Sequence, residues 1–424
     1  MRDLRDLIGR NMLFPALRLM RAQMRQVSDP LKLREAAAKL DALGRPAPDV
    51  RVEPVIAGTA PASWISVKGG RRDGVVLYLH GGAFIAETPM FHGAMLGRIC
   101  RESRCRGLMP SYRLAPEHRY PAALDDCMAA YRWLLAQGHE AGRIVVAGDS
   151  AGGNLTLALL LRLRDEGLPL PAGTVALSPV TDLTFSGESV RRNDGVDDMF
   201  SADSMDGLVP VYLADRELRT HPHVSPVFGD FAGLPQLLVI VGSTELLLDD
   251  AVRVAQRWPQ ATLLVWDGMP HVFVGFDFLP EAREATQRIG RFVRDCLAVE
   301  ATGAVVAKAE VDLAPVREAT LPEGATSHPP RRLGVMARLY LATAVISGSM
   351  WLAVIAWGMG PLLLLAHPLV WLAALSLGAI WAVAGFLFLR ASFGARVGPR
   401  KPRPGLAVEQ VDPVDREPDD RRRR

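Results

Sequence analysis

The sequence has few cysteines and almost no net charge, and both properties restrict its possible functions. Its 424 residues include four cysteines, Cys100, Cys105, Cys127 and Cys296, and carry a formal net charge of +3. The cysteine spacing matches no metal-binding motif, and four cysteines in a chain of this length do not form a disulfide framework. We therefore predict that the cysteines are reduced packing residues and that no metal is bound. So small a charge also argues against a nucleic-acid partner.

Charged residues are missing from one long stretch near the C-terminal end. No Asp, Glu, Lys or Arg occurs from residue 339 to residue 389, a stretch of 51 residues. A membrane-spanning helix needs about 20 residues, so this length predicts two transmembrane helices within 334–392, joined by a turn near 358–368. A buried hairpin in a soluble protein is the alternative, but no other part of the chain could cover it. We therefore expect the lipid bilayer to be a partner.

The charges around this stretch predict its orientation. Both flanks are basic, with Arg331, Arg332 and Arg338 before it and Arg390, Arg396, Arg400, Lys401 and Arg403 after it. Basic flanks stay in the cytoplasm by the positive-inside rule. The N-terminus contains acids and no unbroken apolar run, so a cleaved signal peptide is not expected. We predict a cytoplasmic-membrane protein whose N-terminal part faces the cytoplasm, with a flexible linker at 300–333 and a charged, disordered tail at 393–424.

Short apolar runs alternate with helical patterns between residues 49 and 299. The expected strands lie at 51–55, 62–67, 75–79, 143–147, 174–177, 236–242 and 262–266. Alternation of strand and helix is typical of a doubly wound, mostly parallel sheet with helices on its faces. The fold class is therefore α/β, with 49–299 as the main domain.

Two regions do not follow the sheet pattern. Residues 1–48 predict two amphipathic helices, the second at 31–43, and residues about 183–233 are irregular apart from one helical stretch at 204–214. An insertion of this kind commonly supplies a lid over a binding site. The N-terminal helices either pack on the domain or form part of the lid and touch the membrane through their arginines.

The run 145–154 carries the strongest chemical signal. It passes from an apolar strand through Gly148-Asp149-Ser150-Ala151-Gly152 into a helical pattern. A Gly-x-Ser-x-Gly sequence between a strand and a helix is the pattern of a nucleophile elbow, in which glycines permit a sharp turn that exposes the serine Oγ. Asp149 is interpreted as a loop-supporting residue.

Further candidate residues follow other strands. Glu245 follows 236–242 and His271 follows 262–266, so the chain order is serine, acid, histidine, as in α/β-hydrolases. Asp249 and Asp182 remain alternative acids. Glu245 is favoured because it stands at a strand end, whereas Asp249 and Asp250 resemble solvated acids in the first turn of a helix. Gly81 and Gly82, after strand 75–79, are candidate N–H donors to a developing oxyanion.

Four motifs together resemble the hormone-sensitive lipase family of α/β-hydrolases, especially its bacterial esterases, over roughly residues 25 to 298. They are His-Gly-Gly-Ala-Phe at 80–84, Tyr-Arg-Leu-Ala-Pro-Glu at 112–117, Gly-Asp-Ser-Ala-Gly-Gly-Asn at 148–154 and Ser-Pro-Val-Thr-Asp-Leu-Thr at 178–184. The resemblance implies an α/β-hydrolase fold, Ser150 as nucleophile, His271 as general base, and an oxyanion hole from the N–H groups of Gly81, Gly82 and Ala151. The sequence departs from the family at the acid, where Glu245 stands in place of the usual Asp-Pro-Leu.

The resemblance implies a serine carboxylic-ester hydrolase that acts through an acyl-enzyme on a small or medium acyl ester, without cofactor or metal. The alternatives are a lactone or amide hydrolase of the same fold, an esterase acting on lipids at the membrane, and a catalytically silent ligand-binding protein. The intact set of Ser150, Glu245 and His271 argues against the last of these.

Overall fold

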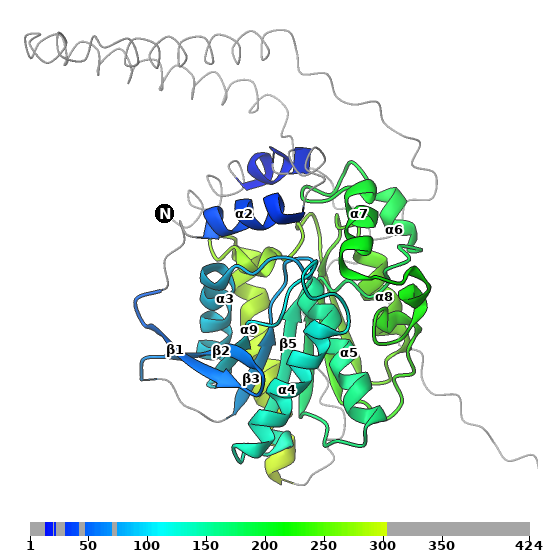
Figure 1. Ribbon diagram of the computed structural model, residues 1–424. Helices are drawn as coiled ribbons and strands as arrows, with labels where there is room; N and C mark the ends of the chain where they lie inside the picture. The colour runs from blue at the N-terminus through cyan, green and yellow to red at the C-terminus, as the bar shows by residue number, and fades with distance from the viewer. Residues whose placement is uncertain (1–12, 20, 23–29, 42–46, 70–73, 303–424) are drawn as a thin grey trace, which may run out of the picture. The chain divides into compact units, whose positions relative to one another are not determined.

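The computed structural model of this chain describes residues 13–19, 21–22, 30–41, 47–69 and 74–302 (Figure 1). The predicted membrane helices at 334–392 and the tail at 393–424 lie outside these ranges, as does nearly all of the linker. Across the described ranges, no helix has the length and apolar character needed to cross a membrane.

An eight-stranded sheet forms the centre of the described part, in the order β1-β2-β4-β3-β5-β6-β7-β8. Strands β1 and β2 pair antiparallel with each other, β2 pairs antiparallel with β4, and β4, β3, β5, β6, β7 and β8 run parallel. The strands are β1 (Val50–Ala57), β2 (Ala60–Val67), β3 (Val75–Leu79), β4 (Arg106–Pro110), β5 (Ile144–Asp149), β6 (Gly173–Leu177), β7 (Gln236–Gly242) and β8 (Ala261–Trp266). The mostly parallel α/β fold is confirmed.

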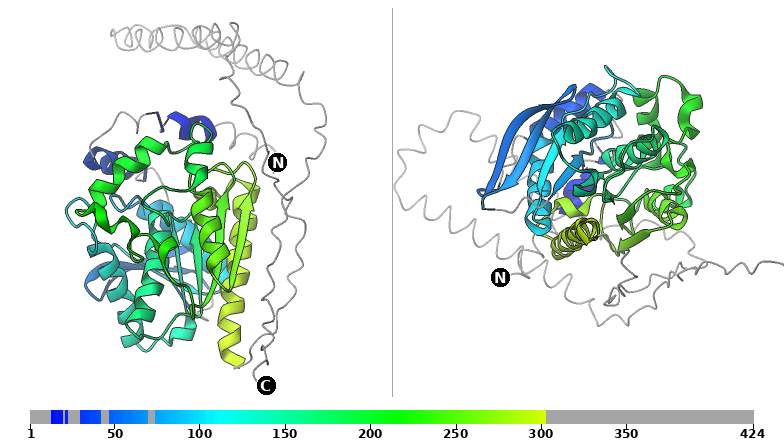
Figure 2. Two further views of the ribbon diagram at one scale, coloured as in Figure 1. Left: turned by 90° about the vertical axis from the view of Figure 1, so that its right-hand side faces the viewer. Right: turned by 90° about the horizontal axis from the view of Figure 1, so that it is seen from below.

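Helices cover both faces of this sheet (Figures 1 and 2). Helices α3 (Pro89–Ser103) and α9 (Pro280–Thr302) pack on one face, and α4 (Ala122–Ala136), α5 (Ala151–Asp165) and α8 (Leu248–Arg257) pack on the other. Helices α2 (Pro30–Asp41), α6 (Glu188–Arg192) and α7 (Ala202–Tyr212) lie towards the upper end of the sheet in the view of Figure 1. Short 3₁₀ turns occur at η1 (Ala141–Arg143), η2 (Arg216–Thr220), η3 (Pro226–Phe228) and η4 (Phe273–Gly275).

Successive side chains of a strand enter two separate cores. In β5, Val146 packs with residues of α4, α5 and α8, whereas Val145 and Ala147 pack with residues of α3 and α9. A strand buried on both faces needs a continuous apolar run, which is what 75–79 and 236–242 show. The bounds of β3 and β7 therefore agree with the prediction.

Strand β4 does not follow from the sequence alone, because Gly107 and Pro110 interrupt its apolar run. Its glycine is explained by packing: a Cβ at Gly107 would lie 2.6 Å from the Leu96 Cδ2 atom of α3. The close approach of helix α3 thus requires a residue without a side chain inside the strand.

Helix α2 lies at the position predicted for the second N-terminal helix and is fastened by Arg34. This side chain donates to the carbonyl oxygens of Ile85 (2.7 Å) and Ala115 (2.7 Å) and pairs with Glu117 (2.7 Å). The contacts tie the N-terminal region to the loops after β3 and β4. Whether this region touches a membrane stays a prediction.

Candidate active site

Ser150 occupies a strained turn between β5 and α5. Its φ of 54° and ψ of −119° are unfavourable for a residue with a side chain. The neighbouring glycines make the turn possible, since a Cβ at Gly148 would lie 2.4 Å from the Gly152 oxygen and one at Gly152 would lie 1.9 Å from the Leu79 oxygen. The Ser150 N–H donates to the Leu177 carbonyl of β6 at 2.8 Å. The predicted elbow geometry is present.

Glu245 and His271 form a buried pair. The distance from His271 Nδ1 to Glu245 Oε2 is 2.8 Å, and the two side chains are 3% and 0% exposed. The other carboxylate oxygen, Oε1, accepts from the Ser178 hydroxyl at 2.8 Å and from the Gly242 N–H at 2.6 Å. The carboxylate is thus held on both sides, with one oxygen directed at the imidazole.

The environment of His271 favours its charged form. Burial lowers its pKa, but the hydrogen bond to Glu245 and the negative charges of Glu245, Asp197 and Asp149 raise it, and the net pKa is above the usual 6.5. Its Nε2 atom has no hydrogen-bond partner among the described residues. One ring nitrogen is therefore held by an acid while the other is open for proton transfer. The ring of Phe200 packs edge-on against the imidazole, with centroids 5.0 Å apart.

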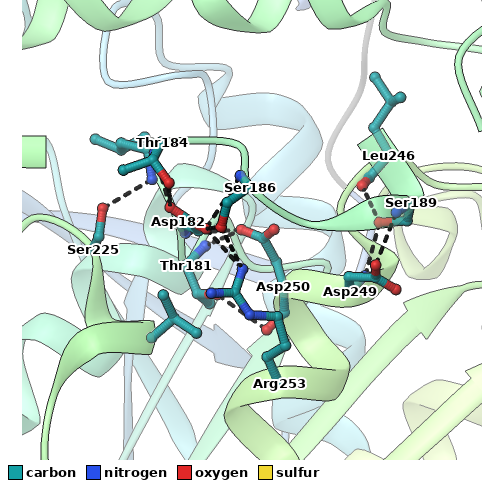
Figure 3. Close-up of polar contacts among 12 residues, drawn as sticks. Thr181, Asp182, Thr184, Ser186, Ser189, Ser225, Leu246, Asp249, Asp250 and Arg253 are labelled. Atoms are coloured by element: carbon teal, nitrogen blue, oxygen red, sulfur yellow. Dashed lines mark hydrogen bonds and ion pairs between the residues drawn. The ribbon is translucent and has the colours of Figure 1, made fainter. Parts of the chain in front are cut away.

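The alternative acids bind elsewhere (Figure 3). The Asp182 carboxylate accepts from the Thr184 and Ser186 hydroxyls and pairs with Arg253 at 2.7 Å. Asp249 accepts from the Ser189 N–H at 2.8 Å. Glu245 is thus the acid that contacts His271 in the described structure.

Asp250 differs from the solvated helix acid that we predicted. It is fully buried and accepts from the N–H groups of Thr181 (2.6 Å) and Asp182 (2.9 Å). Burial, reinforced by the charge of Asp182, raises its pKa to about 7. The prediction was wrong because the chain that follows strand β6 covers this first turn of α8, which a dipole argument does not consider.

The predicted oxyanion donors divide into two groups. The Gly81 N–H donates to Asp149 Oδ1 at 3.0 Å, and the same carboxylate binds the Tyr78 hydroxyl (2.7 Å) and the His92 imidazole (3.2 Å). Gly81 therefore directs its N–H at Asp149 and not at the nucleophile, which corrects its assignment. Asp149 supports the loop, as we interpreted.

Gly82 and Ala151 remain candidate donors. Gly82 has a φ of +116°, and a Cβ there would lie 2.1 Å from the Ala86 oxygen, so this tight loop requires glycine. Ala151 is the first residue of α5, where the helix has N–H groups without acceptors inside the helix.

An apolar cavity of about 30 Å³ lies beside Ser150. Its lining includes Ala83, Phe84, Ala151 and, from helix α7, Met205, Leu208 and Tyr212. The rings of Phe84 and Tyr212 stack with their centroids 3.8 Å apart. The lining is almost entirely apolar, so the space beside the nucleophile suits an apolar group.

No cluster of three or more metal-ligating side chains occurs within the described ranges. The four cysteines are reduced and buried, as predicted. Burial raises the pKa of the Cys296 thiol to about 12, which makes this side chain unreactive at neutral pH.

Sequence reasoning missed Ser178, which joins the acid to the histidine loop. Its hydroxyl donates to Glu245 and accepts from the Val272 N–H at 3.1 Å. The signal was available, because Ser178 directly follows β6 at the sheet edge where Ser150 and Glu245 also lie. Asn193 and Asp197 of the 183–233 insertion were missed too, and they carry no motif.

Known proteins resemble this chain over the same region. A family model described as alpha/beta hydrolase fold matches residues 76–275. An acetyl-hydrolase of Streptomyces hygroscopicus is 40% identical over 258 residues, which cover 59% of this chain and 84% of that protein. An esterase of Acinetobacter venetianus is 35% identical over 268 residues, covering 62% and 88%. The crystal structure of an esterase from the bacterial hormone-sensitive lipase family superposes with a TM-score of 0.64 at 38% identity, covering 67% of this chain and 98% of that one.

Proposed function

The chain belongs to the α/β-hydrolase superfamily, among its hormone-sensitive-lipase-like esterases, and on that premise we propose that Ser150, His271 and Glu245 form its catalytic triad. The protein is a serine carboxylic-ester hydrolase, as its similarity to named esterases and an acetyl-hydrolase indicates. The observation that carries the triad is the buried 2.8 Å contact between His271 and Glu245.

The reaction follows from these groups. His271 Nε2 takes the proton of Ser150 as its Oγ attacks the ester carbonyl, and the tetrahedral oxyanion collapses to an acyl-enzyme when the same nitrogen returns the proton to the leaving alcohol. A water molecule then repeats the attack and releases the acid. Glu245 keeps the Nδ1–H tautomer and stabilises the imidazolium.

We assign the oxyanion hole to the N–H groups of Gly82, Ala83 and Ala151. Ala83 replaces Gly81 in this assignment because it lines the cavity beside Ser150 together with Ala151, whereas the Gly81 N–H binds Asp149. Each such donor contributes about 3 kcal/mol to the transition state by the usual mutational measure.

Covalent labelling tests the nucleophile. A fluorophosphonate probe should label the wild-type protein, and Ser150→Ala should lose both labelling and hydrolysis of p-nitrophenyl acetate while keeping its circular dichroism spectrum. Substantial residual turnover in Ser150→Ala would overturn the serine mechanism, and a wild-type protein that neither labels nor hydrolyses esters would indicate a silent binding protein.

The substrate that we propose is an ester with a short acyl chain. The cavity beside Ser150 is apolar, with the stacked rings of Phe84 and Tyr212 in its wall, and a relative that is 40% identical is an acetyl-hydrolase. In a series of p-nitrophenyl esters from acetate to octanoate, kcat/KM should be highest at acetate or butyrate and fall steeply beyond. A maximum at octanoate would contradict this assignment.

We further propose that residues 334–392 anchor the enzyme in the cytoplasmic membrane with the hydrolase domain in the cytoplasm. The uncharged stretch and its basic flanks support this. A periplasm-active phosphatase fused after Arg403 should be inactive, and a cytoplasm-fluorescent protein at the same position should fluoresce. The opposite pair of results would overturn the topology.

A further inference from the structure

Residues 193–200 of the insertion, here called the brace segment, contact the acid loop and the histidine together. At one end, the Asn193 side-chain amide donates to the carbonyl oxygens of Ser243 (3.2 Å) and Glu245 (2.7 Å). At the other end, the Phe200 ring packs on His271 and lines the cavity beside Ser150. The segment therefore contacts the loop of Glu245 with one end and His271 with the other.

Asp197 joins the Phe200 end of the brace segment to the loop that carries Glu245. Its Oδ1 accepts from the N–H groups of Met199 (2.7 Å) and Phe200 (2.9 Å), and its Oδ2 accepts from the Leu246 N–H at 2.8 Å. Leu246 directly follows Glu245. The residue is only 2% exposed, so these three bonds form in an environment where water does not compete for the carboxylate.

We propose that Asp197 is a positioning residue of this esterase: its carboxylate ties Phe200 to the loop of Glu245, and its negative charge stabilises the His271 imidazolium. The inference rests on the triad proposed above and concerns the same site. No motif or strand end marks Asp197; the contacts alone identify it.

The charge of Asp197 reaches His271 without a direct hydrogen bond. The ionisable groups that act on this imidazole are the carboxylates of Glu245, Asp197 and Asp149, and all three raise its pKa against the effect of burial. Loss of one charge therefore lowers the pKa of His271, and the neutral, basic form then persists to lower pH.

Two arginines near the N-terminus also contact the brace segment. Arg21 donates to the Asp197 carbonyl oxygen at 2.8 Å and pairs with Asp194 at 3.0 Å, and Arg18 pairs with Asp198 at 2.5 Å. Both arginines bind groups other than the Asp197 carboxylate, which leaves that carboxylate to its three N–H donors.

The experiment compares Asp197→Asn with Asp198→Asn in the full-length enzyme. Both substitutions exchange a buried carboxylate for an amide, but Asp198 binds Arg18 and does not contact Leu246. For p-nitrophenyl acetate, kcat of Asp197→Asn should fall by about tenfold or more with KM changed by less than about threefold, since misplacement of a catalytic group mainly lowers kcat. The acid limb of its kcat/KM profile should move to lower pH. Asp198→Asn should leave kcat within about twofold of wild type and the acid limb at the wild-type pH.

A second variant separates the two effects. Asp197→Glu keeps the charge and displaces the carboxylate, so kcat should fall while the acid limb stays at the wild-type pH. If Asp197→Asn does not fold, as judged by circular dichroism, an unchanged kcat in Asp197→Glu overturns the proposal. An unchanged pH profile in folded Asp197→Asn also overturns it. If the wild type itself lacks esterase activity, the triad assignment fails instead, so the two failures are distinguishable.

Discussion

Replacement of Glu245 by Gln tests the triad acid most directly, because the structure predicts which way the new amide faces. Oε1 accepts from the Gly242 N–H at 2.6 Å and from the Ser178 hydroxyl, so a Gln oxygen satisfies both donors there. The Gln NH₂ group then faces His271 Nδ1, which must accept. The proton moves to Nε2, and the imidazole no longer accepts the Ser150 proton.

The magnitude follows from the two orientations of the amide. In the favoured one, the wrong tautomer lowers kcat by about 10⁴ in comparable triads, or about 5 kcal/mol. In the reversed one, the NH₂ group faces the Gly242 N–H, and a buried donor without an acceptor costs about 1–3 kcal/mol, which limits the productive population by a factor of about 5 to 150. We therefore expect kcat/KM for p-nitrophenyl acetate to fall by at least about 5- to 150-fold, and by up to about 10⁴ if the reversed orientation is not productive.

The assay is steady-state hydrolysis near pH 8, with the rate of fluorophosphonate labelling as an independent measure. Asp249→Asn is the matched control, because Asp249 binds Ser189 and not His271, and its activity should stay within about threefold of wild type. A fall of less than about fivefold for Glu245→Gln would refute the assignment, as would a larger fall for Asp249→Asn or Asp182→Asn.

Three further outcomes follow from the structure. On acidification, activity should begin to decline at a pH above the pKa of an ordinary histidine, because the pKa of His271 is raised and its neutral form is the base. A rate that does not change between neutral pH and about pH 5 would contradict this. Gly152→Ala should abolish labelling and lower the melting temperature, because the new Cβ meets the Leu79 carbonyl at 1.9 Å, whereas Gly207→Ala in α7, with nothing within 4 Å, should do neither. The Asp250 carboxyl keeps its proton up to about pH 7 in the native state, whereas the unfolded chain releases it near pH 4. The free energy of unfolding should therefore fall as the pH rises from about 4 to about 7, by up to about 1.4 kcal/mol per pH unit. Urea titrations at several pH values should show a smaller slope for Asp250→Asn, and an unchanged slope would show that Asp250 is not the titrating group.

The sequence predicted the strands best where a strand's own residues mark its bounds. Strands β3 and β7 are uninterrupted apolar runs buried on both faces, so composition alone marks their ends. Strand β4 was missed because Gly107 interrupts its apolar run, and the reason for this glycine, its packing against Leu96 of the preceding helix α3, is not visible in the strand's own pattern. Local propensity cannot detect a requirement that another element imposes.

The same distinction applies to the site. Ser150, Glu245 and His271 each follow a parallel strand, and parallel strands end at one edge, so their convergence was predictable. The direction of the Gly81 N–H was not, because it depends on backbone angles and on the partner Asp149. Asp197 was beyond sequence reasoning because its role comes from the path of an irregular insertion.

Phe200 contacts both His271 and the substrate cavity, and this limits how the enzyme can be redesigned. Its ring packs on His271, the proposed general base, and also forms part of the cavity wall beside Ser150. A smaller residue at this position enlarges the room for the substrate but also removes the support of the imidazole, so acyl-chain selectivity and turnover change together. Met205 and Leu208 of helix α7 line the same cavity, and a library aimed at bulkier esters should vary them first and keep Phe200.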